Sequence, residues 1–164
     1  MDAMSSPARP KTNFDDLLSA VRTDFPLVRF RSSDMFRWSD EARTIYYDTR
    51  ADDPIWSLLH ELGHMQCQHS VYNSDTALIR MEIEAWEGAK LSAERYGLTI
   101  DEDHIQDCMD SYRSWQHKRS TCPVCALNGV EKRDGLYGCI NCRTSWQVGV
   151  DRFCRVYRRR RVML

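Results

Sequence analysis

The chain lacks the features of a secreted or membrane protein. None of its apolar runs is long enough to cross a bilayer, and no secretion signal opens the sequence. We therefore expect a cytoplasmic protein whose seven cysteines are thiols or metal ligands rather than disulfides. An excess of one charge is also missing, because 23 lysines and arginines nearly balance 24 aspartates and glutamates. The chain as a whole is therefore not expected to bind nucleic acid electrostatically.

Length and composition favour one globular domain with a small module attached. Hydrophobic residues make up 42% of the 164 residues and charged residues 29%, which is typical of globular proteins. We expect a disordered N-terminus over 1–12, a main domain over 13–118, a cysteine module over 119–149 and an arginine-rich tail over 150–164.

The expected elements are strands followed by helices. Alternating apolar and polar residues predict strands over 27–31, 35–39 and 42–48. Helices are expected over 14–25, from Pro54 onward, over 76–96 and from Asp101 onward. This order predicts an α+β fold with a short antiparallel sheet, rather than a parallel βαβ sheet.

The strongest functional pattern is H-E-x-x-H, formed by His60, Glu61 and His64. On a helix, positions i and i+4 share one face, so both imidazoles can reach a single Zn²⁺. Glu61 is rotated to one side of them, where it can take a proton from water that attacks a carbonyl. Asp53 and Pro54 are a typical helix start just before the pattern. The pattern therefore predicts a zinc-dependent metallopeptidase with Glu61 as its catalytic residue.

A catalytic zinc normally has three protein ligands, so the two histidines need a third. The metzincin continuation H-x-x-G-x-x-H is absent, because position 67 is cysteine and position 70 is serine. The next helix offers Glu82 and Glu84, which is the gluzincin arrangement. Residues i and i+2 of a helix point about 200° apart, so only one of the two can face the metal. Spacing alone leaves both glutamates open.

A family resemblance bears on that choice. The stretch RMEIEAWEGA at 80–89 resembles the E-x-E-A-N-x-F-A helix of ImmA/IrrE-like metallopeptidases, which also carry H-E-L-G-H on the preceding helix. Position by position, the resemblance implies Glu84 as the third zinc ligand and Glu82 as a neighbour of the site. It covers residues 42–96, and it departs from the family pattern at Trp86 and Gly88.

Four cysteines predict a second, structural zinc. Cys122 and Cys125 form one C-x₂-C pair, and Cys139 and Cys142 form another, with thirteen residues between the pairs. This spacing suits a closed tetrahedral site of the zinc-ribbon type. Asn128-Gly129 and Asp134-Gly135 have hairpin turn chemistry, and Gly138 would permit a tight knuckle turn. The module is too small to bury a core, so the metal must supply much of its folding free energy.

A metallopeptidase domain followed by a zinc ribbon also resembles the layout of SprT-like proteins, which act on DNA-bound proteins. Their third ligand is a histidine in a glycine-flanked motif, and neither His104 nor His117 has such surroundings. The last fourteen residues hold six arginines against one acid, and Arg158, Arg159, Arg160 and Arg161 are consecutive. The tail could bind nucleic acid together with the ribbon, or it could be a solvated basic segment.

Two functions are therefore compatible with the sequence. The first is a zinc metallopeptidase that cleaves an intracellular protein or peptide, including a nucleic-acid-bound one, with one catalytic and one structural zinc. The second is an inactive or regulatory zinc-binding module that binds nucleic acid or a protein partner. The absence of membrane features gives no role to a membrane in either case.

Overall fold

A computed structural model describes residues 13–149 and 158–161. The expected disordered N-terminus and most of the tail lie outside these residues. Four helices occur in the described part: α1 (Phe14–Asp24), α2 (Pro54–Gln66), α3 (Asp75–Arg95) and α4 (Glu102–Ser120). The strands are β1 (Arg29–Ser32), β2 (Arg37–Ser39), β3 (Thr44–Tyr47), β4 (Val130–Arg133), β5 (Leu136–Gly138), β6 (Ser145–Val148) and β7 (Arg158–Arg161). The α+β class is confirmed.

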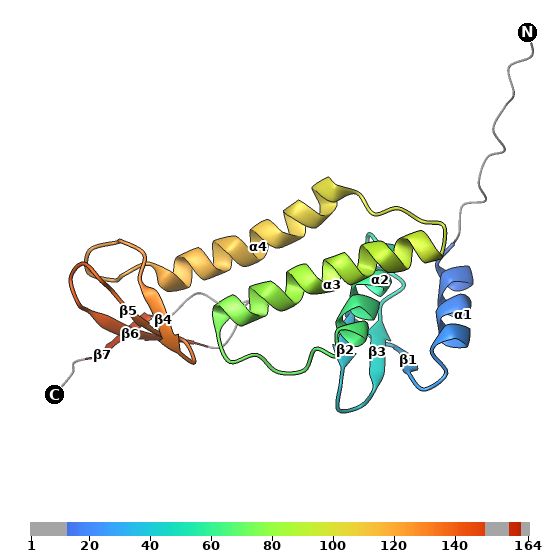
Figure 1. Cartoon of the computed structure of the whole chain (residues 1–164), viewed down its shortest axis with the longest axis horizontal. Coiled ribbons are helices and arrows are strands. Elements are labelled where there is room, and N and C mark those ends of the chain that lie inside the picture. Colours follow the sequence, from blue (N-terminus) through green and yellow to red (C-terminus); the bar gives the residue numbers. More distant parts are fainter. Residues whose placement is uncertain (1–12, 150–157, 162–164) are drawn as a thin grey trace, which may run out of the picture.

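The molecule is elongated. Figure 1 shows α3 and α4 along the long axis, with α1, α2 and the sheet β1–β3 at one end and the sheet β4–β7 at the other. None of the described helices combines the length and apolar composition that a bilayer crossing requires.

The first sheet has the strand order β1-β3-β2, and it is mixed rather than antiparallel as expected. β2 pairs with β3 antiparallel, but β1 pairs with β3 in parallel, Phe30 lying opposite Ile45. The segments 27–31 and 35–39 therefore do not form a hairpin with each other. Thr44 and Ile45 of β3 are fully buried, so this strand takes the central position and separates the other two. β2 is thereby left at the edge nearest α2.

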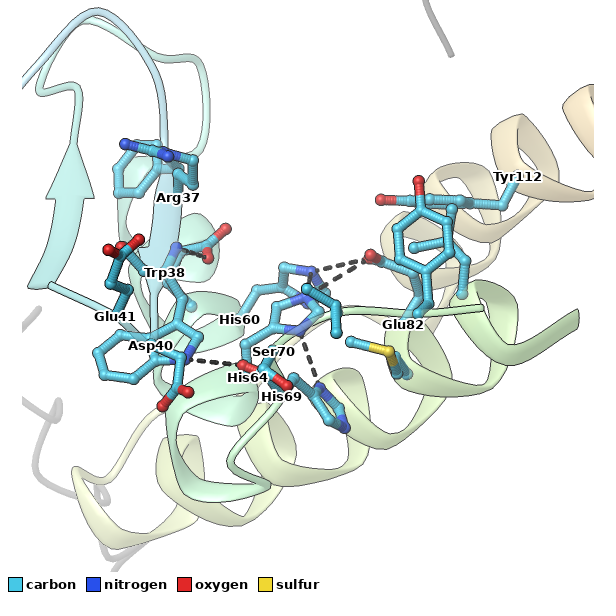
Figure 2. A pocket seen from close by; sticks show the side chains of 17 residues that line it. Arg37, Trp38, Asp40, Glu41, His60, His64, His69, Ser70, Glu82 and Tyr112 are labelled. Atoms are coloured by element: carbon cyan, nitrogen blue, oxygen red, sulfur yellow. Dashed lines mark hydrogen bonds and ion pairs between the residues drawn. The ribbon is translucent and has the colours of Figure 1, made fainter. Parts of the chain in front are cut away.

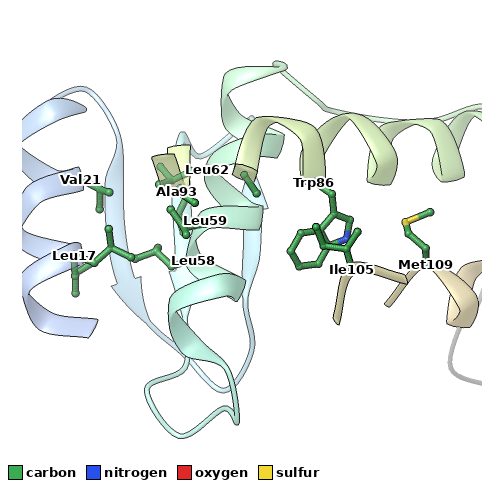
Figure 3. Packing of buried hydrophobic residues seen from close by; sticks show 12 residues of the cluster. Leu17, Val21, Leu58, Leu59, Leu62, Trp86, Ala93, Ile105 and Met109 are labelled. Atoms are coloured by element: carbon green, nitrogen blue, oxygen red, sulfur yellow. The ribbon is translucent and has the colours of Figure 1, made fainter. Parts of the chain in front are cut away.

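The main core joins the helices to this sheet. Leu17 and Val21 of α1 pack with Leu58, Leu59 and Leu62 of α2, all of them fully buried (Figure 3). Trp86 and Ala89 of α3 and Ile105 and Met109 of α4 extend the same cluster. The Asn13 side chain caps α1 by accepting from the Asp16 N–H at 2.9 Å, as its position before the helix predicts. Asp53 occupies the N-cap position of α2 but makes no side-chain capping bond.

The second sheet runs β4-β5-β6-β7, antiparallel throughout. Asp134 and Gly135, with φ of 42° and 72°, form the predicted turn between β4 and β5. The tight turns after the cysteine pairs occur at Ala126 and Arg143, both with φ of 60°, and not at Gly138. Gly138 lies within β5, where a side chain would collide with Lys132. The atoms that it would meet are the flexible end of the exposed Lys132 side chain, so neither a turn nor space requires glycine at this position.

A buried ion pair fixes the ribbon to the helices. Asp75 at the start of α3 accepts from Arg119 at the end of α4, at 2.5 Å from Nε and 2.8 Å from Nη2. The hydroxyl of Tyr137 in β5 donates to the same carboxylate at 2.6 Å. Trp146 of β6 donates from its indole to the Arg119 carbonyl at 2.9 Å. α4 thus continues through the expected boundary at 118/119 into the ribbon, and the ribbon is held at a defined position.

Candidate metal centre and active-site cleft

Three side chains converge where α2 crosses α3. His60 and His64 lie one turn apart on α2, and their Nε2 atoms are 3.1 Å apart. Glu82 of α3 places its Oε2 atom 3.2 Å from His60 Nε2 and 3.7 Å from His64 Nε2 (Figure 2). A tetrahedral zinc with bonds of about 2.0–2.1 Å separates its N and O ligands by about 3.3 Å. The spacing of these three atoms therefore fits such an ion.

Two glycines allow the helices to come this close. A Cβ atom on Gly63 would lie 2.0 Å from the Ala85 carbonyl oxygen, far inside the closest contact that real Cβ atoms make. On the opposing helix, a Cβ atom on Gly88 would lie 3.0 Å from the Gly63 Cα. Gly63, the fourth residue of the H-E-L-G-H segment, therefore sets the distance between the helix with the histidines and the helix with Glu82.

The two glutamates lie where the family resemblance does not place them: Glu82 is next to His60 and His64, and Glu84 is next to His69. Glu84 does not reach His60 or His64, and its side chain is half exposed. Its carboxylate instead lies 3.0 Å from Nε2 of His69. Glu82 is buried and completes the three-residue group. Glu82, and not the predicted Glu84, therefore lies with the two histidines, because the face of α3 that packs against α2 includes Glu82.

A chain of side chains extends from His64 away from the group. His64 Nδ1 and His69 Nδ1 are 2.9 Å apart, and His69 is buried. If His64 Nε2 binds a metal, its proton must be on Nδ1, which then donates to His69. His69 in turn has its proton on Nε2 and donates it to Glu84. Sequence reasoning gave His69 no role, since His69 is one residue early for the metzincin pattern.

Glu61 is held beside the group by the edge strand. Its Oε2 atom accepts from the Trp38 backbone N–H at 2.6 Å. Burial raises the pKa of the Glu61 carboxyl, although the neighbouring His60 and His64 oppose the shift. The Trp38 indole also donates to the His69 carbonyl at 3.0 Å. β2 thus positions both the predicted general base and the histidine behind His64.

The two histidines favour the anionic form of Glu82. Burial alone would raise the pKa of Glu82, but hydrogen bonds from His60 and His64 lower it well below its ordinary value. Burial would likewise lower the pKa of His64, and the hydrogen bond and charge of Glu82 raise it instead. His60 packs on Trp86 with ring centroids 4.2 Å apart, and its Nδ1 has no hydrogen-bond partner among the described residues. The donor set is therefore two imidazoles and a carboxylate, the ligands that zinc takes.

A cleft with a volume of about 640 Å³ opens on this group. It is lined by residues 36–41, by the connection 69–72 and by parts of α2, α3 and α4. A second hollow of about 410 Å³ adjoins it, and His60, Glu61 and Glu82 line both. Tyr112 of α4 also lines both.

Tyr72, Tyr96 and His104 are of residue types that can stabilise an oxyanion by donating a hydrogen bond. Tyr72 lines the cleft and His104 lines the second hollow. Tyr96 lines neither, and its hydroxyl donates to Asp24 at 2.9 Å.

The four ribbon cysteines form the second group that could hold a metal ion. Sγ atoms of Cys122 and Cys142 are 3.5 Å apart, and those of Cys125 and Cys139 are 3.4 Å apart. Zinc–sulfur bonds of about 2.3 Å in a tetrahedron give separations of about 3.8 Å, close to these values. The hydrogen bonds with Thr144 lower the pKa of the Cys142 thiol to about 6, which favours the thiolate that a metal requires.

The remaining predicted residues lie elsewhere. Cys67 and Cys108 are outside both groups, on α2's C-cap and on α4, and Cys154 lies outside the described residues. Arg158–Arg161 form β7 at the edge of the ribbon sheet. Comparison with family models, curated proteins and solved structures finds no match to the chain.

Proposed function

We propose that the protein is a zinc-dependent metallopeptidase of the H-E-x-x-H type. The observation that carries the proposal is the convergence of His60, His64 and Glu82 within ligand distance of one another, on a cleft that also holds Glu61. Three protein ligands leave one position of a tetrahedral ion for water or substrate, as catalytic zinc sites require. A purely structural site would have four protein ligands, and the ribbon group has that composition.

The residues then have distinct roles. His60, His64 and Glu82 hold the metal, which when bound polarises the substrate carbonyl and lowers the pKa of water. Glu61 accepts a proton from the attacking water and passes it to the leaving amine. The Trp38 N–H fixes the Glu61 carboxylate in place for both transfers. Burial of Glu61 supports this role, because a raised pKa brings a carboxylate closer to the operating pH of a general base.

The cleft suits an extended polypeptide. β2 is an edge strand of its sheet, and residues 36–41 line the cleft from that side. A substrate segment can add to such an edge through main-chain hydrogen bonds, with side chains entering pockets on alternate sides. The substrate class that we propose is therefore a protein or peptide in extended conformation.

Metal content is the first test. The wild-type protein should contain about two zinc ions and the His60→Ala/His64→Ala variant about one, according to the ligand counts of the two groups. One zinc in both proteins would leave the ribbon as the sole metal site and refute the proposal.

Turnover is the second test. Glu61→Gln should keep both zinc ions and lose cleavage of a peptide library followed by mass spectrometry. Glu82→Gln should lose one zinc, and Glu84→Gln should retain both with a 10–100-fold weaker zinc affinity at the first site, as is typical of groups behind a metal ligand. Wild-type protein with two zinc ions and no cleavage of any library member would favour the inactive binding module.

A further inference from the structure

Positive charge is concentrated at one end of the molecule. Residues 117–164 contain eleven lysines and arginines against three acids, a net charge of +8. Residues 1–116 contain twelve lysines and arginines and twenty-one acids, a net charge of −9. The charge is therefore distributed very unevenly, although the whole chain is nearly neutral. The ribbon and the proposed peptidase domain lie at opposite ends of α3 and α4 (Figure 1). The asymmetry in sequence is therefore also a separation in space.

The arginine-rich strand is part of the ribbon sheet. β7 pairs with β6 over four residues, from Val148 opposite Arg158 to Ser145 opposite Arg161. Pairing fixes the backbone of these arginines, so less conformational entropy is lost when they bind a ligand. Six cations of the ribbon sheet and its turns are exposed: Lys132, Arg133, Arg143, Arg158, Arg159 and Arg160.

Cations from both edges of the sheet meet on one face. Residues directly opposite each other in an antiparallel pair project to the same face, so Arg159 shares a face with Gln147 and, two residues away, with Ser145. Lys132 of β4 extends over β5 and places its Nζ atom 3.4 Å from the Ser145 hydroxyl. One strand spacing of about 4.8 Å separates β6 from β7. The Lys132 ammonium therefore lies next to the strand that carries Arg159.

The part of the chain that the structure describes gives these charges no carboxylate partner. Among the described residues, none of the six cations is ion-paired with a carboxylate. The nearby Glu131 is occupied by main-chain donors, accepting from the Asp75 and Gly135 N–H groups at 2.7 and 2.9 Å. The buried Arg119, in contrast, is paired with Asp75. The described residues of this end of the molecule thus include one internal ion pair and a set of exposed cations that have no carboxylate partner among those residues.

We propose that these six cations form a binding surface for the phosphodiester backbone of a nucleic acid. Guanidinium groups bind phosphate oxygens in a bidentate manner, and contacts of this kind position a protein on nucleic acid without reading its sequence. Successive arginines of β7 project to alternate faces, so Arg159 lies on the face of Lys132 and Arg158 and Arg160 lie on the other face. A phosphodiester chain that follows this edge of the sheet can contact both sets, because it carries an anion at every nucleotide. Single-stranded and duplex nucleic acids share the phosphodiester backbone that this surface would bind. The salt dependence of binding distinguishes the two, because each phosphate contact contributes a smaller slope on a single strand than on a duplex.

The test is fluorescence anisotropy of the full-length, zinc-loaded protein with a labelled 20-nucleotide single strand and its matched duplex, between 50 and 200 mM salt. If all six cations contact phosphates, the slope of log K against log salt should be about −4 for the single strand or about −5 for the duplex. Lys132→Gln/Arg159→Gln should reduce the slope by about 2 and weaken binding at 0.1 M salt by about 25- to 60-fold. Arg31→Gln/Arg95→Gln, in the acidic part, is the matched control and should change neither quantity.

Equal losses in the two double variants would overturn the proposal, because the effect would then come from net charge rather than from this surface. A slope near zero would also overturn it. So would binding to phosphatidylglycerol vesicles or polyglutamate without binding to either oligonucleotide. The measurement needs no turnover and no metal at the His60 site, so failure of the peptidase proposal would leave this result interpretable.

Discussion

Replacing Gly63 by alanine tests whether close contact between α2 and α3 creates the metal centre. The new Cβ would lie 2.0 Å from the Ala85 carbonyl oxygen, whereas real Cβ atoms essentially never come closer than 3.0 Å. The helices must therefore move apart by about 1 Å or more. Metal ligands tolerate errors of only about 0.2 Å, so Glu82 could no longer share an ion with His60 and His64.

Two opposing energies decide the effect on stability. Alanine in place of glycine within a helix stabilises it by about 1 kcal/mol. Overpacking a buried contact costs about 1–3 kcal/mol, so we expect net destabilisation of up to about 2 kcal/mol. This corresponds to a fall in Tm of up to about 8 °C for a chain of this size. The larger effect should be on metal content, because a small shift removes a ligand without unfolding the core.

The assay is zinc content by mass spectrometry together with thermal unfolding. Gly63→Ala should fall from about two zinc ions to about one, while Gly88→Ala, with a 3.0 Å contact, should show a smaller loss of zinc affinity. Ser114→Ala on the exposed side of α4 is the control and should keep both ions. A Gly63→Ala protein with two zinc ions and unchanged Tm would refute the reasoning, since the two helices would then not need this contact.

Other perturbations follow from the buried groups. Because burial raises the pKa of Glu61, the acid limb of kcat/KM should lie above pH 4.5, its ordinary value, and activity should fall as the carboxylate takes up a proton. Asp75→Ala leaves the Arg119 guanidinium buried without its partner and should cost about 3–5 kcal/mol in urea unfolding, whereas a cost below 1 kcal/mol would mean that the ribbon can detach. Burial and the hydrogen bond with Asp75 raise the pKa of Tyr137, so its contribution to stability is present below about pH 10 and is lost at higher pH. Tyr137→Phe should therefore be less stable at pH 8 and lose less between pH 9 and 11, and parallel losses in both proteins would contradict this.

Local patterns predicted the helices, and they predicted the two histidines and the four cysteines that the structure brings together. The Asn13 cap, the proline at the start of α2 and the histidine spacing act within one or two turns, so they are readable from the chain. The cysteine spacing is equally local. The order of the first sheet was not readable, because the pairing of β1 with β3 depends on which strand buries both its faces.

The choice between Glu82 and Glu84 depends on the rotation of α3 about its axis. That rotation is set by packing against α2, through Gly63, Ala85 and Gly88. A local signal did exist: Glu82 precedes the buried Ala85 and Ala89 by three and seven residues, which places it on their face. Glu84 precedes them by one and five residues and falls beside that face. The stripe of small residues was thus a better guide than the family motif, from which Trp86 and Gly88 already depart.

The attachment of the ribbon has a geometric consequence for the cleft. Asp75, which holds the ribbon, and Glu82, which completes the proposed metal centre, are seven residues apart on α3. Seven residues are nearly two turns and about 10 Å, so both side chains project from almost the same side of the helix. Inserting or deleting one residue between them would turn Asp75 by about 100° relative to Glu82 and move it out of line with Arg119 of α4. The length of this short stretch of helix therefore decides whether the buried ion pair that holds the ribbon can form while Glu82 faces the histidines.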